Sequence, residues 1–139
     1  MLMKYFPVFL LITLFICSCK DSTQQEKDLL NDILKVHDKV MMKDEALMKN
    51  KSRLDSLLKL PAKDTAEKVN MKGIDLKLVA AGEAMENWMR KFQTDMTGKP
   101  HDEVMKYFTD QKKQVMAIDS QVNVALSESN KYFSTHKVK

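Results

Sequence analysis

Helix-breaking residues divide most of this chain into three long segments. Proline occurs only at positions 7, 61 and 100, and the three glycines are Gly73, Gly82 and Gly98. Proline cannot continue the interior of a helix, so Pro61 and the Gly98–Pro100 stretch mark connections. Between them the sequence predicts helices over about 23–60, 65–93 and 101–134. Asp64 and Glu67 are spaced as in a capping box at the start of the second helix.

Apolar residues recur at three- and four-residue spacing in all three segments, which is typical of amphipathic helices. In the first segment the stripe is Leu30, Ile33, His37, Val40, Asp44, Leu47, Lys51, Leu54 and Leu58. In the second it is Met71, Ile74, Leu78, Ala81, Met85, Trp88 and Phe92, and in the third Val104, Phe108, Gln111, Val115, Ile118, Val122, Ala125, Ser129 and Tyr132. Short connections make neighbouring helices antiparallel. We therefore expect an all-α fold, an up-down-up three-helix bundle over 26–134 with coiled-coil-like packing, followed by a basic tail at 135–139.

The first residues have the pattern of an export signal. Lys4 is followed by an almost unbroken apolar run from Tyr5 to Ile16. A helix needs about 20 apolar residues to cross a bilayer, and this run is shorter. The sequence therefore predicts a signal peptide over 1–18.

The window Ile16-Cys17-Ser18-Cys19 is similar to a lipobox, in which a small residue precedes the cysteine that becomes acylated. Cleavage before Cys19 would remove Cys17, so no disulfide is expected in the mature chain. We expect Cys19 to carry a covalent lipid, with no other cofactor, and residues 19–25 to form a tether. The predicted location is the cell envelope, anchored to the outer membrane, with its periplasmic or surface face left open.

Composition and motifs limit the functional classes. The 23 basic and 19 acidic side chains are mixed along the chain, whereas a nucleic-acid interface needs clustered basic residues. The sequence contains no nucleophile-base-acid pattern, glycine-rich phosphate loop or zinc-ligand spacing. The favoured interpretation is a non-enzymatic envelope lipoprotein, a helical interaction or scaffold module for another envelope protein, in an oligomeric state that the sequence leaves open.

Folding the predicted helices against one another brings several unusual side chains to one level. If the second helix folds back antiparallel on the first through the connection at Pro61, His37 lies opposite Trp88. Met85 and Phe108 then fall near the same level of the bundle. Methionine often fills gaps beside aromatic rings, so the favoured interpretation is a core cluster of His37, Met85, Trp88 and Phe108.

A soft-metal site is the alternative interpretation of the same region. His37 and Met41 are four residues apart, as are Met85 and Met89, so each pair shares a helical face. Thioethers and imidazole are ligands that suit Cu(I). The alternative function is therefore a periplasmic copper-binding module that uses these four side chains.

Polar residues also interrupt the predicted apolar stripes. Asp44 and Lys51 occupy positions where the first helix should present apolar side chains. The same antiparallel folding brings Lys51 towards Asp75 and Asp119, and Asp44 towards Gln111. Buried polar pairs often set the register of neighbouring helices, so we expect a register role for these five residues.

Three segments carry a resemblance to a known group of proteins. They are 36–41, 107–113 and above all 84–92, where Met85, Trp88 and Met89 are followed by Phe92. Together they resemble small helical lipoproteins of Gram-negative bacteria commonly labelled "viral A-type inclusion protein". The resemblance implies a helical lipoprotein and carries over no activity, cofactor or partner.

Overall fold

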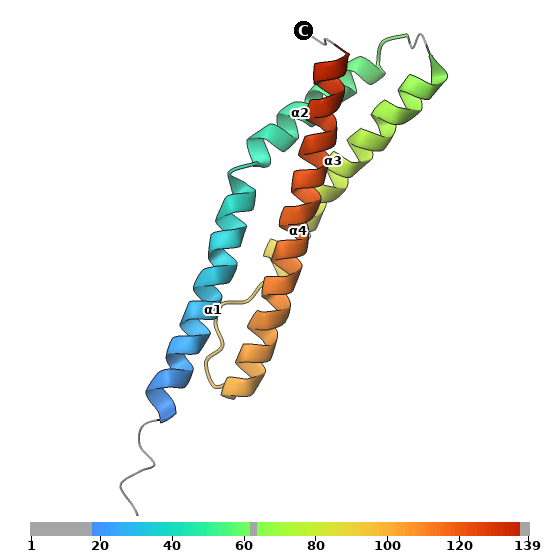
Figure 1. Ribbon diagram of the computed structural model, residues 1–139. Helices are drawn as coiled ribbons and strands as arrows, with labels where there is room; N and C mark the ends of the chain where they lie inside the picture. The colour runs from blue at the N-terminus through green and yellow to red at the C-terminus, as the bar shows by residue number, and fades with distance from the viewer. Residues whose placement is uncertain (1–17, 62–63, 137–139) are drawn as a thin grey trace, which may run out of the picture.

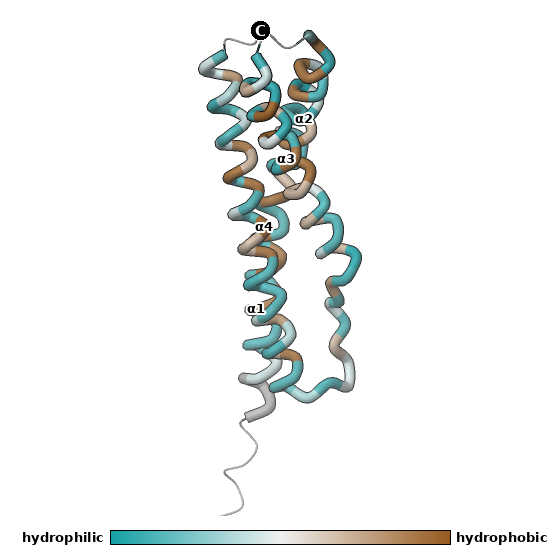
Figure 2. The backbone as a smooth tube through the Cα atoms, turned by 90° about the vertical axis from the view of Figure 1, so that its right-hand side faces the viewer, coloured by the Kyte–Doolittle hydropathy of each residue, from teal (hydrophilic) through white to brown (hydrophobic). Residues whose placement is uncertain are grey.

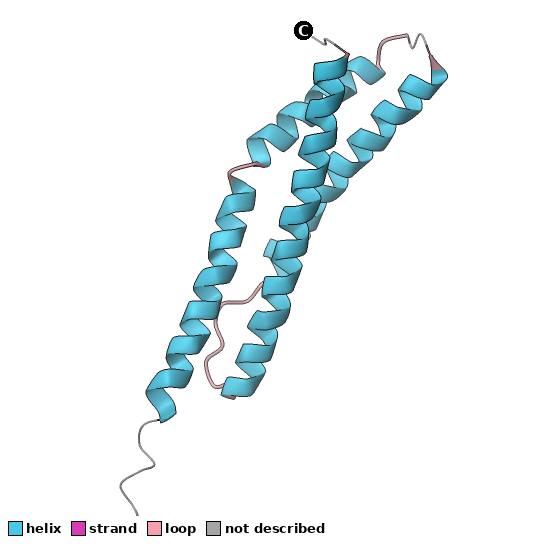
Figure 3. Cartoon of the chain, viewed as in Figure 1, coloured by secondary structure: helices cyan, strands magenta, loops and turns pink. Residues whose placement is uncertain are grey.

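The computed structural model describes residues 18–61 and 64–136, and the regular structure of these ranges is entirely helical (Figure 3). Helix α1 spans Ser18–Met41, α2 spans Asp44–Leu58, α3 spans Thr65–Lys91 and α4 spans His101–Thr135. The predicted helical bundle is confirmed. Residues 1–17, which hold most of the predicted signal peptide, and residues 137–139 of the basic tail lie outside the described residues.

The helices form three rows that run up, down and up: α1 with α2, then α3, then α4. Helices α1 and α2 run one after the other in one direction, α3 returns, and α4 runs parallel to α1 and α2 (Figure 1). With 35 residues, α4 is about 50 Å long and packs against the other three helices. Helix α1 packs along the first half of α4 and α2 along its second half, whereas α3 lies beside α4 from Tyr107 to Tyr132 (Figure 1).

The apolar stripes meet along the bundle axis to form the core. Hydrophobic and hydrophilic stretches alternate along every helix, as Figure 2 shows. The predicted stripe of α3 is buried from Met71 to Trp88, and that of α4 from Val104 to Tyr132 with Gln111 half-buried. Each fully buried aliphatic side chain contributes about 1.5–3 kcal/mol relative to exposure. The bundle is thus held together mainly by hydrophobic burial between helices.

The predicted first helix over 23–60 is wrong at its middle, where the chain turns between α1 and α2 (Figure 3). The amide of Lys43 bonds to the carbonyl of Val40, 2.9 Å away and three residues back, so the α-helical pattern is interrupted. Neither glycine nor proline lies there. The break is a tertiary effect, because it lets α1 follow α4 while α2 packs on both α3 and α4.

The buried positions of α1 and α2 follow a seven-residue repeat. Ile33, Val40, Leu47 and Leu54 are at most 5% exposed. The intervening stripe positions His37, Asp44 and Lys51 are only half-buried. A strict seven-residue repeat is the pattern of coiled-coil packing, in which one seam faces the partner helices.

The predicted bounds shift at several ends. Helix α1 already begins at Ser18, so the predicted tether at 19–25 is helical, because no helix breaker separates it from the bundle. Helix α3 ends at Lys91 and not at 93, and α4 runs one residue beyond 134. Asp64 caps α3 as predicted, accepting a hydrogen bond from the Ala66 amide at 2.9 Å. Glu67 does not complete the capping box, because its carboxylate accepts the Tyr132 hydroxyl at 3.0 Å.

The connection between α3 and α4 runs lengthwise along the bundle (Figure 1). Gly98 has a φ of 80°, a conformation that glycine adopts without steric strain. The amide of Gln93 donates to the Tyr107 hydroxyl at 2.9 Å, so α3 ends beside the second turn of α4. Helix α4 therefore begins below the end of α3, and this displacement sets which residues of α4 meet the other helices.

Candidate functional site

His37 and Met89 meet where α1 passes the end of α3. The His37 Nε2 atom lies 3.3 Å from the Met89 sulfur. The imidazole ring lies 6.0 Å from the Trp88 ring, measured between centroids. The His37 side chain is 25% exposed and Met89 is 39% exposed, so solvent reaches this pair. We call His37, Met89 and the Trp88 ring the His37–Met89 site.

The other imidazole nitrogen of His37 has a carboxylate partner. Nδ1 lies 3.0 Å from the Asp38 carboxylate, which in its ionised form only accepts hydrogen bonds. Nδ1 therefore carries the proton in the neutral ring. The lone pair then resides on Nε2, the nitrogen that faces the Met89 sulfur.

An aromatic chain continues from this site into the core. The Trp88 ring stacks on Phe92 at 4.6 Å, and Phe92 lies parallel to Tyr107 at 6.4 Å. Tyr107 in turn lies 5.7 Å from Phe108. Trp88, Met85 and Phe108 are each at most 5% exposed, so these predicted core residues are buried.

The four predicted soft-metal ligands do not share one environment. Met85 is 5% exposed, whereas Met41 is 38% exposed at the end of α1. Of the four, His37 and Met89 lie in direct contact. Among residues 18–61 and 64–136, no three or more His, Cys, Asp or Glu side chains are arranged to hold a metal ion. A metal at this point would thus depend on sulfur ligands.

Asp119 of α4 binds two lysines of the first row. Its carboxylate accepts from Lys39 at 2.9 Å and from Lys43 at 2.6 Å, and Lys43 also donates to Asn123 at 2.6 Å. Burial raises the pKa of Asp119, but the hydrogen bonds and charges of Lys43 and Lys39 outweigh it and hold the pKa below the ordinary value. The Asp119 side chain is 14% exposed, so these contacts are partly shielded from solvent.

A second polar contact begins inside the bundle and reaches its surface at Asn130. Asn50 of α2 is 5% exposed and donates to Ser129 and to Asn130, each at 2.8 Å. The pairs Lys39–Asp119, Lys43–Asn123 and Asn50–Asn130 all join residues 80 positions apart. These three contacts therefore fix one register between the first row, α1 with α2, and the parallel helix α4. The prediction missed Asn50, although it lies three residues after Leu47 and four before Leu54 and so shares their helical face.

The predicted contact of Lys51 with Asp119 is wrong. Lys51 instead donates to Asp55 at 2.6 Å within α2. The hydrogen bond that Lys51 donates to Asp55 raises the pKa of Lys51, with a smaller contribution from the charge of Asp75. Within the described residues, Asp75 Oδ1 is buried without a hydrogen-bond partner.

The predicted pairing of Asp44 with Gln111 is also wrong. Asp44 is the first residue of α2, where a carboxylate stabilises the positive end of the helix dipole. Gln111 lies between α3 and α4, beside Trp88. Both errors have one cause: the observed contacts of α4 with the first row join residues about 80 positions apart, whereas the predicted pairs are 67 and 68 apart, so α4 is displaced by about three helical turns from its predicted register.

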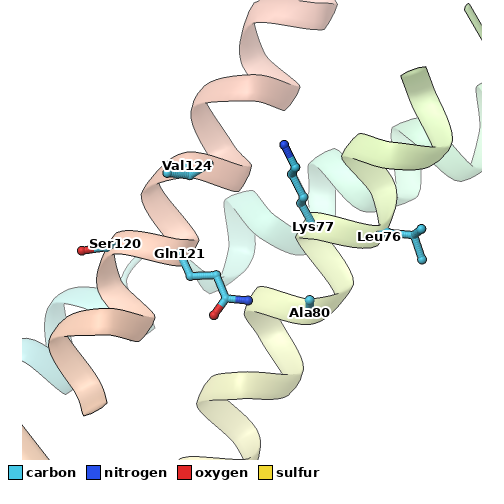
Figure 4. A pocket seen from close by; sticks show the side chains of 6 residues that line it. All are labelled: Leu76, Lys77, Ala80, Ser120, Gln121 and Val124. Atoms are coloured by element: carbon cyan, nitrogen blue, oxygen red, sulfur yellow. The ribbon is translucent and has the colours of Figure 1, made fainter. Parts of the chain in front are cut away.

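A groove runs between α3 and α4 on the surface of the bundle. One hollow of about 450 Å³ is shown in Figure 4 and is lined by Leu76, Lys77, Ala80, Ser120, Gln121 and Val124. A second, of about 380 Å³, is lined by Ala84, Asn87, Trp88, Lys91, Gln111, Gln114, Ala117 and Ile118. We call these two hollows together the α3–α4 groove.

The α3–α4 groove combines small and exposed apolar side chains. The small Ala80 side chain leaves space between the helices, and Gln121 extends towards it from α4 (Figure 4), while Leu76 is 59% and Val124 is 51% exposed. Exposed apolar surface bordered by polar residues is typical of protein interaction sites. The prediction of an exposed interacting face did not locate this groove, because the sequence alone does not show which stripe stays uncovered.

Comparisons with families of known proteins, with curated proteins and with solved structures found no match to this chain. The resemblance to small Gram-negative lipoproteins therefore stays a prediction. Within the described residues, no helix is both long and apolar enough to cross a membrane.

Proposed function

We propose that this chain is a non-enzymatic, lipid-anchored envelope protein whose α3–α4 groove docks a helix of another envelope protein. The apolar leader and the lipobox ending at Cys19 support the anchor. The observation that carries the docking role is the α3–α4 groove, where Leu76 and Val124 border small side chains on two neighbouring helices.

A helix is the occupant that suits this groove. Ala80 and Ala84 on α3, with Ala117 and Ser120 on α4, are three to four residues apart and allow close approach of a third backbone. A docked helix would cover the exposed Leu76 side chain and extend the packing pattern of the bundle.

The charges of the groove favour an acidic partner helix. Its charged lining residues are Lys77 and Lys91, one in each hollow. Glu128 already pairs with Lys77 at 2.6 Å, so Lys91 is the more available cation. We therefore expect the partner to present an apolar stripe flanked by carboxylates, since complementary charges favour one docking register.

Photocrosslinking in living cells tests the docking role. A photoreactive amino acid at Val124 should yield one discrete adduct, whereas the same group at Met48, 65% exposed on α2, should not. Ala80→Arg fills the groove from an exposed position and should abolish the adduct. An adduct that survives Ala80→Arg contradicts docking in the groove. An adduct of twice the chain mass contradicts a different partner protein and identifies the occupant of the groove as a second copy of this chain.

Metabolic labelling tests the anchor separately. With a radioactive fatty acid, the wild-type chain should be labelled, and Cys19→Ala should be unlabelled and retain its leader. Labelling of Cys19→Ala would contradict the assignment of the acylated residue.

A further inference from the structure

We propose that the His37–Met89 site binds Cu(I), with the His37 Nε2 atom and the Met89 sulfur as ligands and the Trp88 ring beside the metal. This site lies between α1 and α3; it shares Trp88 with the α3–α4 groove, but its ligand atoms belong to His37 and Met89, which line neither hollow. The proposal is therefore independent of helix docking.

The distance between the two donor atoms suits a shared metal. Metal bonds to imidazole nitrogen and to sulfur are about 2.0–2.1 and 2.3 Å long, so two such ligands on one ion lie about 3–4 Å apart. Nε2 and the Met89 sulfur lie 3.3 Å apart, and with Nδ1 protonated both atoms present lone pairs. A cation between them would satisfy both.

The surroundings of His37 match those of a metal ligand. Imidazole ligands usually donate their second nitrogen to a carboxylate, which fixes the tautomer and raises ligand basicity. Asp38 provides this contact at 3.0 Å from Nδ1. The 6.0 Å separation of the His37 and Trp88 rings also brings a cation at Nε2 within range of the electron-rich indole face.

The donor set selects Cu(I) among common metals. A thioether with one imidazole is a soft pair, whereas Zn²⁺ and Cu²⁺ favour additional nitrogen, oxygen or thiolate ligands. Met41 lies one helical turn after His37 and is 38% exposed, so its thioether can turn towards Nε2 and supply a third ligand without disturbing the core.

Fluorescence titration tests the site directly, because Trp88 is the single tryptophan of the chain. Cu(I) is added without oxygen to the purified chain with Cys17 and Cys19 replaced by serine, in competition with a chromophoric Cu(I) chelator. We expect saturable quenching at one equivalent of metal. Met89→Leu conserves side-chain volume and should weaken binding at least about tenfold. His37→Gln should do the same, and Met41→Leu should weaken binding less.

Matched controls separate this site from nonspecific thioether binding. Met48→Leu removes an exposed methionine of α2 and should leave the titration unchanged, as should Ala80→Arg in the groove. Quenching that is equal in wild type and Met89→Leu overturns the proposal. So does affinity weaker than micromolar, or a stoichiometry that falls with Met48→Leu. Circular dichroism of each variant confirms that the helices are retained, and the Met89→Leu result decides if His37→Gln unfolds.

Discussion

Replacing Asp119 by asparagine should loosen the contact between α1 and α4. The carboxylate accepts hydrogen bonds from Lys39 and Lys43 and is 14% exposed. The asparagine amide retains one acceptor oxygen but loses the negative charge. Lys43 keeps its second partner, Asn123, at 2.6 Å, so the ammonium is not left without an acceptor.

The size of the effect follows from these contacts. A hydrogen bond to a charged group contributes about 1.5–3 kcal/mol, and the retained acceptors reduce the loss. We expect Asp119→Asn to lower the free energy of unfolding by about 1–2 kcal/mol at pH 7, with Tm lower by about 5 °C. Glu128→Gln is the matched control, because Glu128 lies on the same helix as Asp119, but Glu128 and its partner Lys77 of α3 are 38% and 52% exposed. Exposed pairs contribute about 0–1 kcal/mol.

The pH dependence gives the reasoning a second, independent check. Asp119 has a pKa below its ordinary value of 3.8 in the folded chain, so its contribution is present above pH 3.8 and is lost as the pH falls through the folded pKa. Urea unfolding of wild type and Asp119→Asn should therefore differ by a constant amount from pH 7 to about pH 5. The difference should shrink below the ordinary pKa.

Two results would refute this account of the α1–α4 contact. One is a difference between wild type and Asp119→Asn that does not change with pH, which would point to packing and not to charge. The other is an equal loss of stability in Glu128→Gln, which would mean that partial burial of the Asp119 carboxylate has no energetic consequence.

Three further perturbations test the core and its polar contacts. Leu54→Ala removes a side chain with 0% exposure and should cost about 3 kcal/mol in urea unfolding, whereas Leu60→Ala, at 58% exposure, should cost less than about 0.5 kcal/mol. Asn50→Ala deletes one buried and one partly buried hydrogen bond and should cost about 1–2 kcal/mol by the same measurement. Burial and the hydrogen bond to Glu67 raise the pKa of Tyr132 from 10.0 to about 12, so its contribution is full below pH 10 and lost as the pH rises through 12. Tyr132→Phe should lack this alkaline loss when its thermal unfolding is compared with wild type.

The sequence was sufficient for the elements that depend on local chemistry. Apolar spacing located α3 and α4 to within two residues, and Asp64 was correctly placed as the cap of α3. The level of His37 relative to Trp88 also followed from the sequence, because a short connection between α2 and α3 permits simple antiparallel folding. Helix propensity, capping and periodicity act over a few residues, so one sequence shows them.

The break at Lys43, the register of α4 and the uncovered groove depended on the tertiary structure. No residue at the break forbids a helix, and the turn arises because α1 and α2 pack against different neighbours. The Asp119 contacts depend on how far the α3–α4 connection travels along the bundle, which composition does not reveal. Amino-acid order thus determined which helix faces are apolar, whereas tertiary packing decided which of those faces meet. The hydrophobic effect is non-directional, so burying an apolar face is favourable against any apolar partner.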